Sequence, residues 1–325
     1  MFISLRVMTV AALLSASVPV AAQTWPTRPV TLVVTFAAGS GDDVLARILS
    51  PRLSELLGQQ VIIENIGGAG GMTGVSRVAK AAPDGYQFVL GGIGTFAANQ
   101  TLYKNPPYNA ATDFTPVAFI SEQPMALIAR KDFPARNLQE FIAYGRVNEA
   151  KIQFGSGGSG SATHLACVLM NSSIGLNVTH VPYRSAALSI QDMVGGRVDY
   201  ACPITSTALG HIQGHQVKPI AILSKERSPI LPDLASAHEQ GVAGFDTQMW
   251  NGFFLPKGTP TAITRKLHDA TVAAMNTPAL QARLKEIGGT FVAPERRSPD
   301  YLQKFVESEI NKWAGPIRAS GVSME

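Results

Sequence analysis

Cysteine, concentrated positive charge and long apolar runs are all scarce in this sequence. The chain of 325 residues has two cysteines, and its 27 lysines and arginines stand against 23 acidic residues. The resulting net charge of +4 is spread along the chain rather than gathered in a basic run. Proteins that bind nucleic acid gather basic residues on one face, so we expect no nucleic-acid partner. After residue 22, no apolar run approaches the roughly 20 residues that a membrane-spanning helix needs.

Signatures of catalytic and metal-binding proteins are also missing. The loop at Gly39 lacks the Gly-Lys-Ser/Thr ending of a P-loop, and no Gly-x-Ser-x-Gly nucleophile elbow occurs. His211 and His215 are four residues apart, but no glutamate lies between them as in a zinc-binding H-E-x-x-H helix. These absences favour a protein that is not an enzyme and that uses neither a metal nor a cofactor.

Residues 1–22 resemble a secretory signal. Arg6 gives a short positive region, residues 7–20 are apolar, and small residues precede a cleavage position before Gln23. An uncleaved anchor is the alternative, although the apolar stretch is short for a span of roughly 20 residues. We therefore expect an exported, periplasmic protein whose mature chain is long enough for two domains.

Strand and helix patterns alternate along the mature chain. Apolar strands at 30–35, 61–65 and 88–90 are separated by helical patterns, which indicates parallel βαβ units. A second α/β pattern begins near Ile152, and the last part is helical at 262–275, 278–287 and 299–319. Two apolar segments that flank the middle block suggest two crossings, with one domain of residues 23–121 plus 251–325 and another of 122–250. Two crossings permit hinge closure over a cleft.

Two loops rich in glycine and serine join a predicted strand to a predicted helix, at residues 35–43 and 154–163. Backbone N–H groups at a helix N-terminus attract an anion, so we expect a small oxyanion held from two sides. Residues 155–160 also match the dinucleotide pattern G-x-G-x-x-G, but no acid follows at 177–182 where that fold requires one. The pattern of small hydroxyl residues favours the oxyanion.

Two acidic residues and two cysteines have alternative interpretations. We expect Asp43 to stabilise the first turn of its helix, whereas Asp42 either does the same or points into the cleft. Export permits a disulfide between Cys167 and Cys202. Because a sequence does not give the Cα spacing that a bridge needs, we favour two buried free thiols.

The ordered motifs resemble the tripartite tricarboxylate transporter receptor family, the Bug-type periplasmic solute-binding proteins. A Phe-Pro-Ala-Gly-Gly-x-x-Asp loop of that family corresponds to residues 36–43, where Ser40 and Gly41 depart from the usual pattern. The remaining matching segments follow in order at 25–30, 64–65, 68–71, 82–86, 154–156, 164–165, 180–183, 195–199, 227–229 and 231–233.

The resemblance implies a two-lobed α/β type II periplasmic-binding-protein fold. It also implies a monomer that binds a carboxylate ligand and passes it to membrane transporter subunits. Cys202-Pro203-Ile204 replaces a polar segment that often contains an acid, which favours a dicarboxylate or aromatic acid over an acidic amino acid. By position, the ligand-binding residues are Phe36, Ala38, Gly39, Ser40, Gly41, Asp42, Gly92, Thr95, Ser156, Gly158, Ser159, Thr163, Tyr183, Arg184, Ser185 and Ile204.

Three questions stay open from the sequence. Arg184 either pairs with a distal carboxylate or faces solvent. The same closure would suit a sensory protein that signals to a membrane kinase. An exported α/β hydrolase is a further alternative, with Ser156 or Ser159 beside His164 as its only candidate pair.

Overall fold

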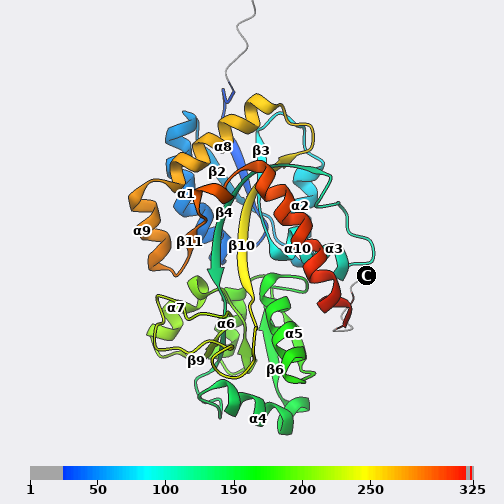
Figure 1. Ribbon diagram of the computed structural model, residues 1–325, viewed down its shortest axis with the longest axis vertical. Coiled ribbons are helices and arrows are strands. Elements are labelled where there is room, and N and C mark those ends of the chain that lie inside the picture. The colour runs from blue at the N-terminus through cyan, green and yellow to red at the C-terminus, as the bar shows by residue number, and fades with distance from the viewer. Residues whose placement is uncertain (1–24, 320–322, 324–325) are drawn as a thin grey trace, which may run out of the picture.

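The computed structural model describes residues 25–319 and residue 323, so the predicted signal segment lies outside the described residues. Two β-sheets, each covered by helices, are stacked along the long axis of the molecule (Figure 1). We call each sheet with its helices a lobe. This arrangement confirms the predicted two-lobed α/β fold class. Within the described part of the chain, no helix is both long and apolar enough to cross a membrane.

The first lobe contains a mixed six-stranded sheet. Its strands, in spatial order, are β11 (Thr290–Phe291), β4 (Phe114–Pro124), β10 (Gln248–Pro256), β3 (Gln87–Gly92), β1 (Val30–Val34) and β2 (Val61–Asn65). One face packs against α1 (Gly41–Leu57), α8 (Thr261–Met275) and α9 (Pro278–Glu286). The other carries α2 (Met72–Ala79), the π-helix η2 (Gly94–Ala98), α3 (Asn99–Leu102) and α10 (Pro299–Ala319). Short 3-10 turns are η1 (Ala69–Gly71) and η4 (Pro294–Arg296).

The second lobe contains a five-stranded sheet. Its strands, in spatial order, are β7 (Thr179–Pro182), β6 (Gln153–Ser156), β8 (Tyr200–Ala201), β5 (Ala126–Arg130) and β9 (Val217–Ile222). Helices α4 (Leu138–Asn148) and α5 (Ala162–Ile174) contribute to one core cluster, and α6 (Ala186–Val194) and α7 (Thr205–Gln213) to another. The 3-10 turn η3 (Glu149–Lys151) follows α4.

The chain passes between the lobes beside two long antiparallel strands. Strand β4 ends at Pro124, and β5 begins in the other sheet at Ala126. The return passage enters β10 at Gln248, directly opposite Pro124. In Figure 1, β4 and β10 descend together from the upper lobe toward the lower one.

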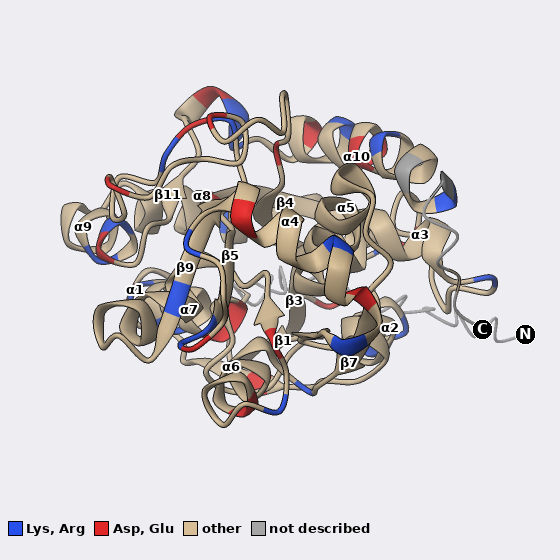
Figure 2. Cartoon of the chain, turned by 90° about the horizontal axis from the view of Figure 1, so that it is seen from below, with Lys and Arg blue, Asp and Glu red and all other residues tan. Residues whose placement is uncertain are grey.

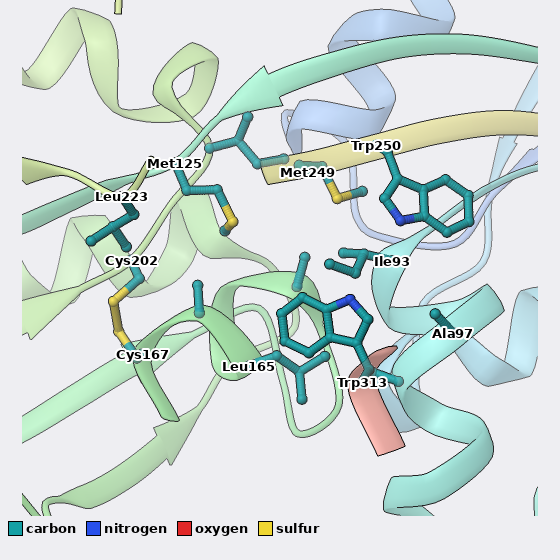
Figure 3. Close-up of a cluster of buried hydrophobic side chains, with 14 of the residues drawn as sticks. Ile93, Ala97, Met125, Leu165, Cys167, Cys202, Leu223, Met249, Trp250 and Trp313 are labelled. Atoms are coloured by element: carbon teal, nitrogen blue, oxygen red, sulfur yellow. A yellow bond between two sulfur atoms is a disulfide. The ribbon is translucent and has the colours of Figure 1, made fainter. Parts of the chain in front are cut away.

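The two cysteines form a disulfide, so the prediction of free thiols is wrong. Cys167 and Cys202 have Cα atoms 5.4 Å apart and share an S–S bond. Figure 3 shows the bridge at the edge of a cluster of apolar side chains from both lobes, which includes Leu165 and Met249. Helix α5 and the segment after β8 are far apart in sequence, and only the tertiary fold brings these sulfur atoms together. The bridge therefore links the middle of α5 to the segment between β8 and α7.

Charged residues of both signs are interspersed over the described elements (Figure 2). This distribution agrees with the spread-out charge of the sequence.

Candidate functional site

A small cavity of about 30 Å³ lies where the two lobes meet. The first lobe contributes side chains from the β1–α1 loop and from β10, and the second contributes residues from three helix starts. The lining residues are Phe36, Ser40, Gly41, Asp42, Gly157, Ser161, Ala162, Thr163, Ala186, Ile204, Thr207 and Met249. No lysine or arginine is among these described lining residues. An anion here would depend on hydroxyl and backbone donors.

Helices α1, α5 and α6 begin at this cavity with a similar arrangement. Serine is the N-cap of each helix, and its hydroxyl oxygen accepts a hydrogen bond from a backbone N–H in the first turn. The distances are 3.2 Å for Ser40, 3.3 Å for Ser161 and 3.3 Å for Ser185. The first N–H groups of a helix lack partners within it, and the helix dipole is positive at that end. Three such ends favour a negatively charged group between them.

Asp43 holds the β1–α1 loop in place. Its carboxylate accepts hydrogen bonds from the Gly39 N–H at 2.9 Å, from Arg47 Nε at 2.8 Å and from Asn65 Nδ2 at 3.0 Å. Burial pushes the pKa of Asp43 upward, but the bonds from Arg47, Gly39 and Asn65 outweigh it and hold the pKa below its ordinary value. Asp43 therefore stabilises the first turn, as the sequence predicts.

Asp42 lies in a different environment, although it is the adjacent residue. It is 3% exposed, lines the cavity and accepts a hydrogen bond from Asn251 Nδ2 at 2.9 Å. Burial raises its pKa to about 6, while the bond from Asn251 lowers it and the neighbouring charge of Asp43 raises it further. This carboxyl group can therefore change its protonation state close to neutral pH.

The loop of the second lobe is held by neutral groups. The hydroxyl of Thr163 accepts a hydrogen bond from the Gly157 N–H at 2.8 Å, and His164 Nδ1 accepts one from the Gly160 N–H at 3.1 Å. Burial lowers the pKa of His164 to about 3, with a smaller contribution from His180. Burial also lowers the pKa of His180 to about 4. Both rings are therefore neutral near neutral pH.

The hydroxyl of Ser156, one of the two serines of the candidate hydrolase pair, has a different histidine as its partner. Ser156 lies 2.7 Å from His180 Nε2 rather than beside His164, and its side chain is buried. Its hydroxyl also donates to the Gly158 carbonyl at 3.2 Å. The Ser159 carbonyl accepts a bond from Tyr103 of the other lobe at 3.3 Å. These contacts organise the loop.

The matching family model is described as tripartite tricarboxylate transporter family receptor, and it covers residues 45–322. The chain belongs to this family.

Three solved structures show similar folds. MatC from Rhodopseudomonas palustris, with bound malate, is 37% identical, covers 90% of this chain and 100% of its own, and has a TM-score of 0.88. The periplasmic binding protein BugD is also 37% identical, with coverage of 93% and 100% and a TM-score of 0.89. R. palustris Rpa4515 with adipate is 34% identical, with coverage of 92% and 99% and a TM-score of 0.87.

The predicted ligand residues of this family receptor fall into three groups. Six line the cavity: Phe36, Ser40, Gly41, Asp42, Thr163 and Ile204. Four line a wider groove of about 590 Å³ at the mouth between the lobes: Gly158, Ser159, Tyr183 and Arg184. Six line neither space: Ala38, Gly39, Gly92, Thr95, Ser156 and Ser185.

Several members of the third group support their neighbours. The Thr95 hydroxyl accepts a hydrogen bond from the Gly92 N–H at 3.2 Å, which shapes the turn after β3. Ser185 is the N-cap of α6. Gly92 lies close to Met249 and to the Trp250 carbonyl. A Cβ atom at position 92 would lie 2.5 Å from that carbonyl oxygen, so a larger residue does not fit there. Direct ligand contact by these residues stays a prediction.

Sequence reasoning missed the contributions of β10 and α7. Met249 and Thr207 line the cavity, and Asn251 orients Asp42. Met249 and Asn251 lie in an apolar strand more than 200 residues after the loop that they contact, so no local pattern indicates them. The run of three hydroxyl residues after Ile204 is a signal that could have pointed to α7. The buried hydroxyl oxygens of Thr205, Ser206 and Thr207 have no hydrogen-bond partner in the described residues.

Proposed function

We propose that this receptor captures a small organic carboxylate between its lobes and delivers it to the membrane subunits of a tripartite tricarboxylate-type transporter. The observation that carries the proposal is the convergence of three serine-capped helix N-termini on one cavity lined by hydroxyls but by no described basic side chain. Malate and adipate in two similar structures support a dicarboxylate, and the apolar Ile204 also suits an aromatic acid.

We further propose that the two predicted domains, residues 23–121 plus 251–325 and residues 122–250, move relative to each other, with residues 122–124 and 248–250 staying with the first domain because they belong to its sheet. A cavity of about 30 Å³ has room for no more than a few water molecules, so a dicarboxylate requires the lobes to move apart. The two passages between sheets, at Met125 and just before Gln248, lie side by side and would serve as the hinge. Closure would then bury the ligand between both loops.

Capture of this kind requires no chemical step, so we propose a binding protein rather than an enzyme. Export by the predicted signal would place a monomeric receptor in the periplasm. Uptake of radiolabelled acid by cells lacking the gene tests the delivery step. We expect uptake to fall and to return with the wild-type gene, whereas unchanged uptake would argue against delivery.

A thermal-shift screen tests the binding proposal. The mature chain is mixed with dicarboxylates, aromatic acids, acidic amino acids and, as controls, neutral sugars. We expect at least one dicarboxylate or aromatic acid to raise the melting temperature, since ligand at 100 times its Kd stabilises a fold by about 2.7 kcal/mol. A response to sugars alone, or to no acid, would contradict the proposal.

A further inference from the structure

Asp42 is an acidic side chain in the same cavity to which we assign a carboxylate ligand. Its side chain is 3% exposed and lies among the lining groups, with Met249 as an apolar neighbour. One carboxyl oxygen accepts the bond from Asn251 Nδ2 at 2.9 Å. Asn251 is itself fully buried, and its Oδ1 has no hydrogen-bond partner within residues 25–319. Asp42 is therefore held in one orientation at the position where the ligand would be bound.

Among the residues that the structure describes around Asp42, none supplies a cation to neutralise it. On its own helix, Asp43 is the charged neighbour, and Arg47 forms its ion pair with Asp43 at 2.8 Å. The cavity residues presented by β10, α5, α6 and α7 are all uncharged. They are Met249 from β10, Ala162 and Thr163 from α5, Ala186 from α6, and Ile204 and Thr207 from the start of α7.

Two carboxylates that share a small buried site repel each other, and one of them takes a proton. We propose that Asp42 takes up one proton from solvent when a carboxylate ligand binds, and that its O–H group then donates a hydrogen bond to the ligand carboxylate. Asp42 is thereby a specificity-determining residue of the site. This inference rests on the proposed function, because it assigns the bound anion to the same cavity.

Burial supports the step, since it already raises the pKa of Asp42 to about 6 without a ligand. A ligand carboxylate alongside would raise that pKa further. Near neutral pH the free receptor would then be mostly ionised at Asp42 and the complex protonated. A carboxyl–carboxylate hydrogen bond is charge-assisted and therefore short and strong. A ligand that presents only a hydrogen-bond donor to Asp42 would instead favour the ionised form and bind without a proton.

Calorimetric titration measures this proton directly. Malate and adipate are each titrated into the mature protein at about pH 7 and 8, where both acids are ionised, in two buffers with different ionisation enthalpies. We expect uptake of close to one proton per bound ligand. The Kd should rise by up to tenfold per pH unit, as linkage to one proton requires.

Two Asp→Asn variants complete the experiment. Asp42→Asn presents a permanent N–H donor, so we expect no proton uptake, a Kd independent of pH, and binding at about pH 8 at least as tight as in wild type. Asp269→Asn removes the same charge from an exposed position of α8 and should behave as wild type. Thermal melts of both variants report whether they fold.

Each outcome bears on the inference. If wild type binds either acid with a pH-independent Kd and without proton uptake, the inference is wrong and the proposed function stands. If folded Asp42→Asn loses binding while wild type takes up no proton, Asp42 is an acceptor for a ligand donor, and the inference again fails. If neither acid binds wild type, and no other carboxylate does so in the thermal-shift screen, the proposed function and this inference fail together.

Discussion

The two loops that face each other across the cavity, at residues 35–43 and 154–163, have similar backbone arrangements but are held by different chemical groups. Each follows a buried parallel strand and ends at a serine N-cap. The first loop is held by the charged network of Asp43 and also presents Asp42 to the cavity. The second is held by Thr163 and the neutral ring of His164. Similar backbone geometry therefore arises from a carboxylate in one lobe and from uncharged groups in the other.

The difference predicts opposite responses to pH. Asp42 has a raised pKa, so its contribution to stability is fully present below the ordinary pKa of 3.8 and is lost as pH rises through about 6. His164 has a lowered pKa, so the unfolded chain binds a proton more readily, and stability is lost as pH falls from 6.5 toward about 3. Asp42 should therefore stabilise the fold most at low pH, whereas His164 should stabilise it most above about pH 6.5.

The largest expected effect comes from the disulfide. It attaches to α5, the helix that follows the second loop, and not to α1, the helix that follows the first. Replacing Cys167 and Cys202 together by serine opens a loop with a sequence separation of 35 residues, and we expect unfolding free energy to fall by about 3 to 4 kcal/mol. Urea denaturation of the purified double variant measures the change. A loss below about 1 kcal/mol would show that packing alone holds α5 against the start of α7.

The pH contrast comes next in size. As pH rises from about 4 to 7, wild type should lose the stabilisation that comes from protonated Asp42, whereas Asp42→Asn should not. The unfolding free energy of the variant should therefore rise relative to that of wild type, by at most about 3 kcal/mol. Denaturant titrations across this range measure it, and subtracting the two proteins removes the other titrating groups. A difference that stays constant with pH would contradict the raised pKa of Asp42.

A smaller contrast concerns the groups that hold each loop. Asp43→Ala should lower unfolding free energy by about 2 kcal/mol, since the N–H groups of Gly39 and Asn65 both lose an acceptor. Thr163→Val should cost about 1 kcal/mol, because chiefly the Gly157 N–H loses its partner. Equal losses in the two variants would argue against a charged network that is specific to the first loop.

Gly41 tests the contact between the lobes. A Cβ atom at this position would lie 2.6 Å from Cδ1 of Ile204. We expect Gly41→Ala to obstruct closure and to raise the Kd for a bound acid at least tenfold, about 1.4 kcal/mol, while thermal stability changes little. Adding Ile204→Ala should recover part of the affinity. An unchanged Kd in Gly41→Ala would mean that the ligand-bound lobes stay further apart.

Elements set by local pattern could be predicted closely from the sequence. Strand β2 (Val61–Asn65) and helix α10 (Pro299–Ala319) begin and end where their apolar periodicity indicates. The predicted loop of residues 35–43 implies that helix α1 begins at Val44, but the helix begins three residues earlier, at Gly41, because Ser40 is its N-cap. The anion loops were likewise recognisable, since glycine, serine and a following apolar helix pattern lie together in sequence.

Features that depend on distant contacts could not be predicted. The cysteine pair needs a Cα distance that only the packing of α5 against the end of β8 determines. Strand β4 has a register irregularity opposite Asn251 and Gly252, next to Ser121. The apolar run at residues 117–120 is followed there by Ser121, Glu122 and Gln123, and these polar residues interrupt the strand pattern before β4 ends at Pro124. The bond from Asn251 to Asp42 joins residues 209 positions apart, so the environment that distinguishes Asp42 from Asp43 is absent from the local sequence.

Calorimetry with matched pairs of acids and neutral amides tests the central claim most directly. Malate, adipate and benzoate are titrated into the mature protein, each beside the amide analogue of the same shape. Three helix N-termini and surrounding hydroxyls stabilise a negative charge, so we predict one site per chain that binds at least one acid and binds its amide at least 100-fold more weakly, about 2.7 kcal/mol. Equal affinity for an acid and its amide would contradict an anion site between the lobes.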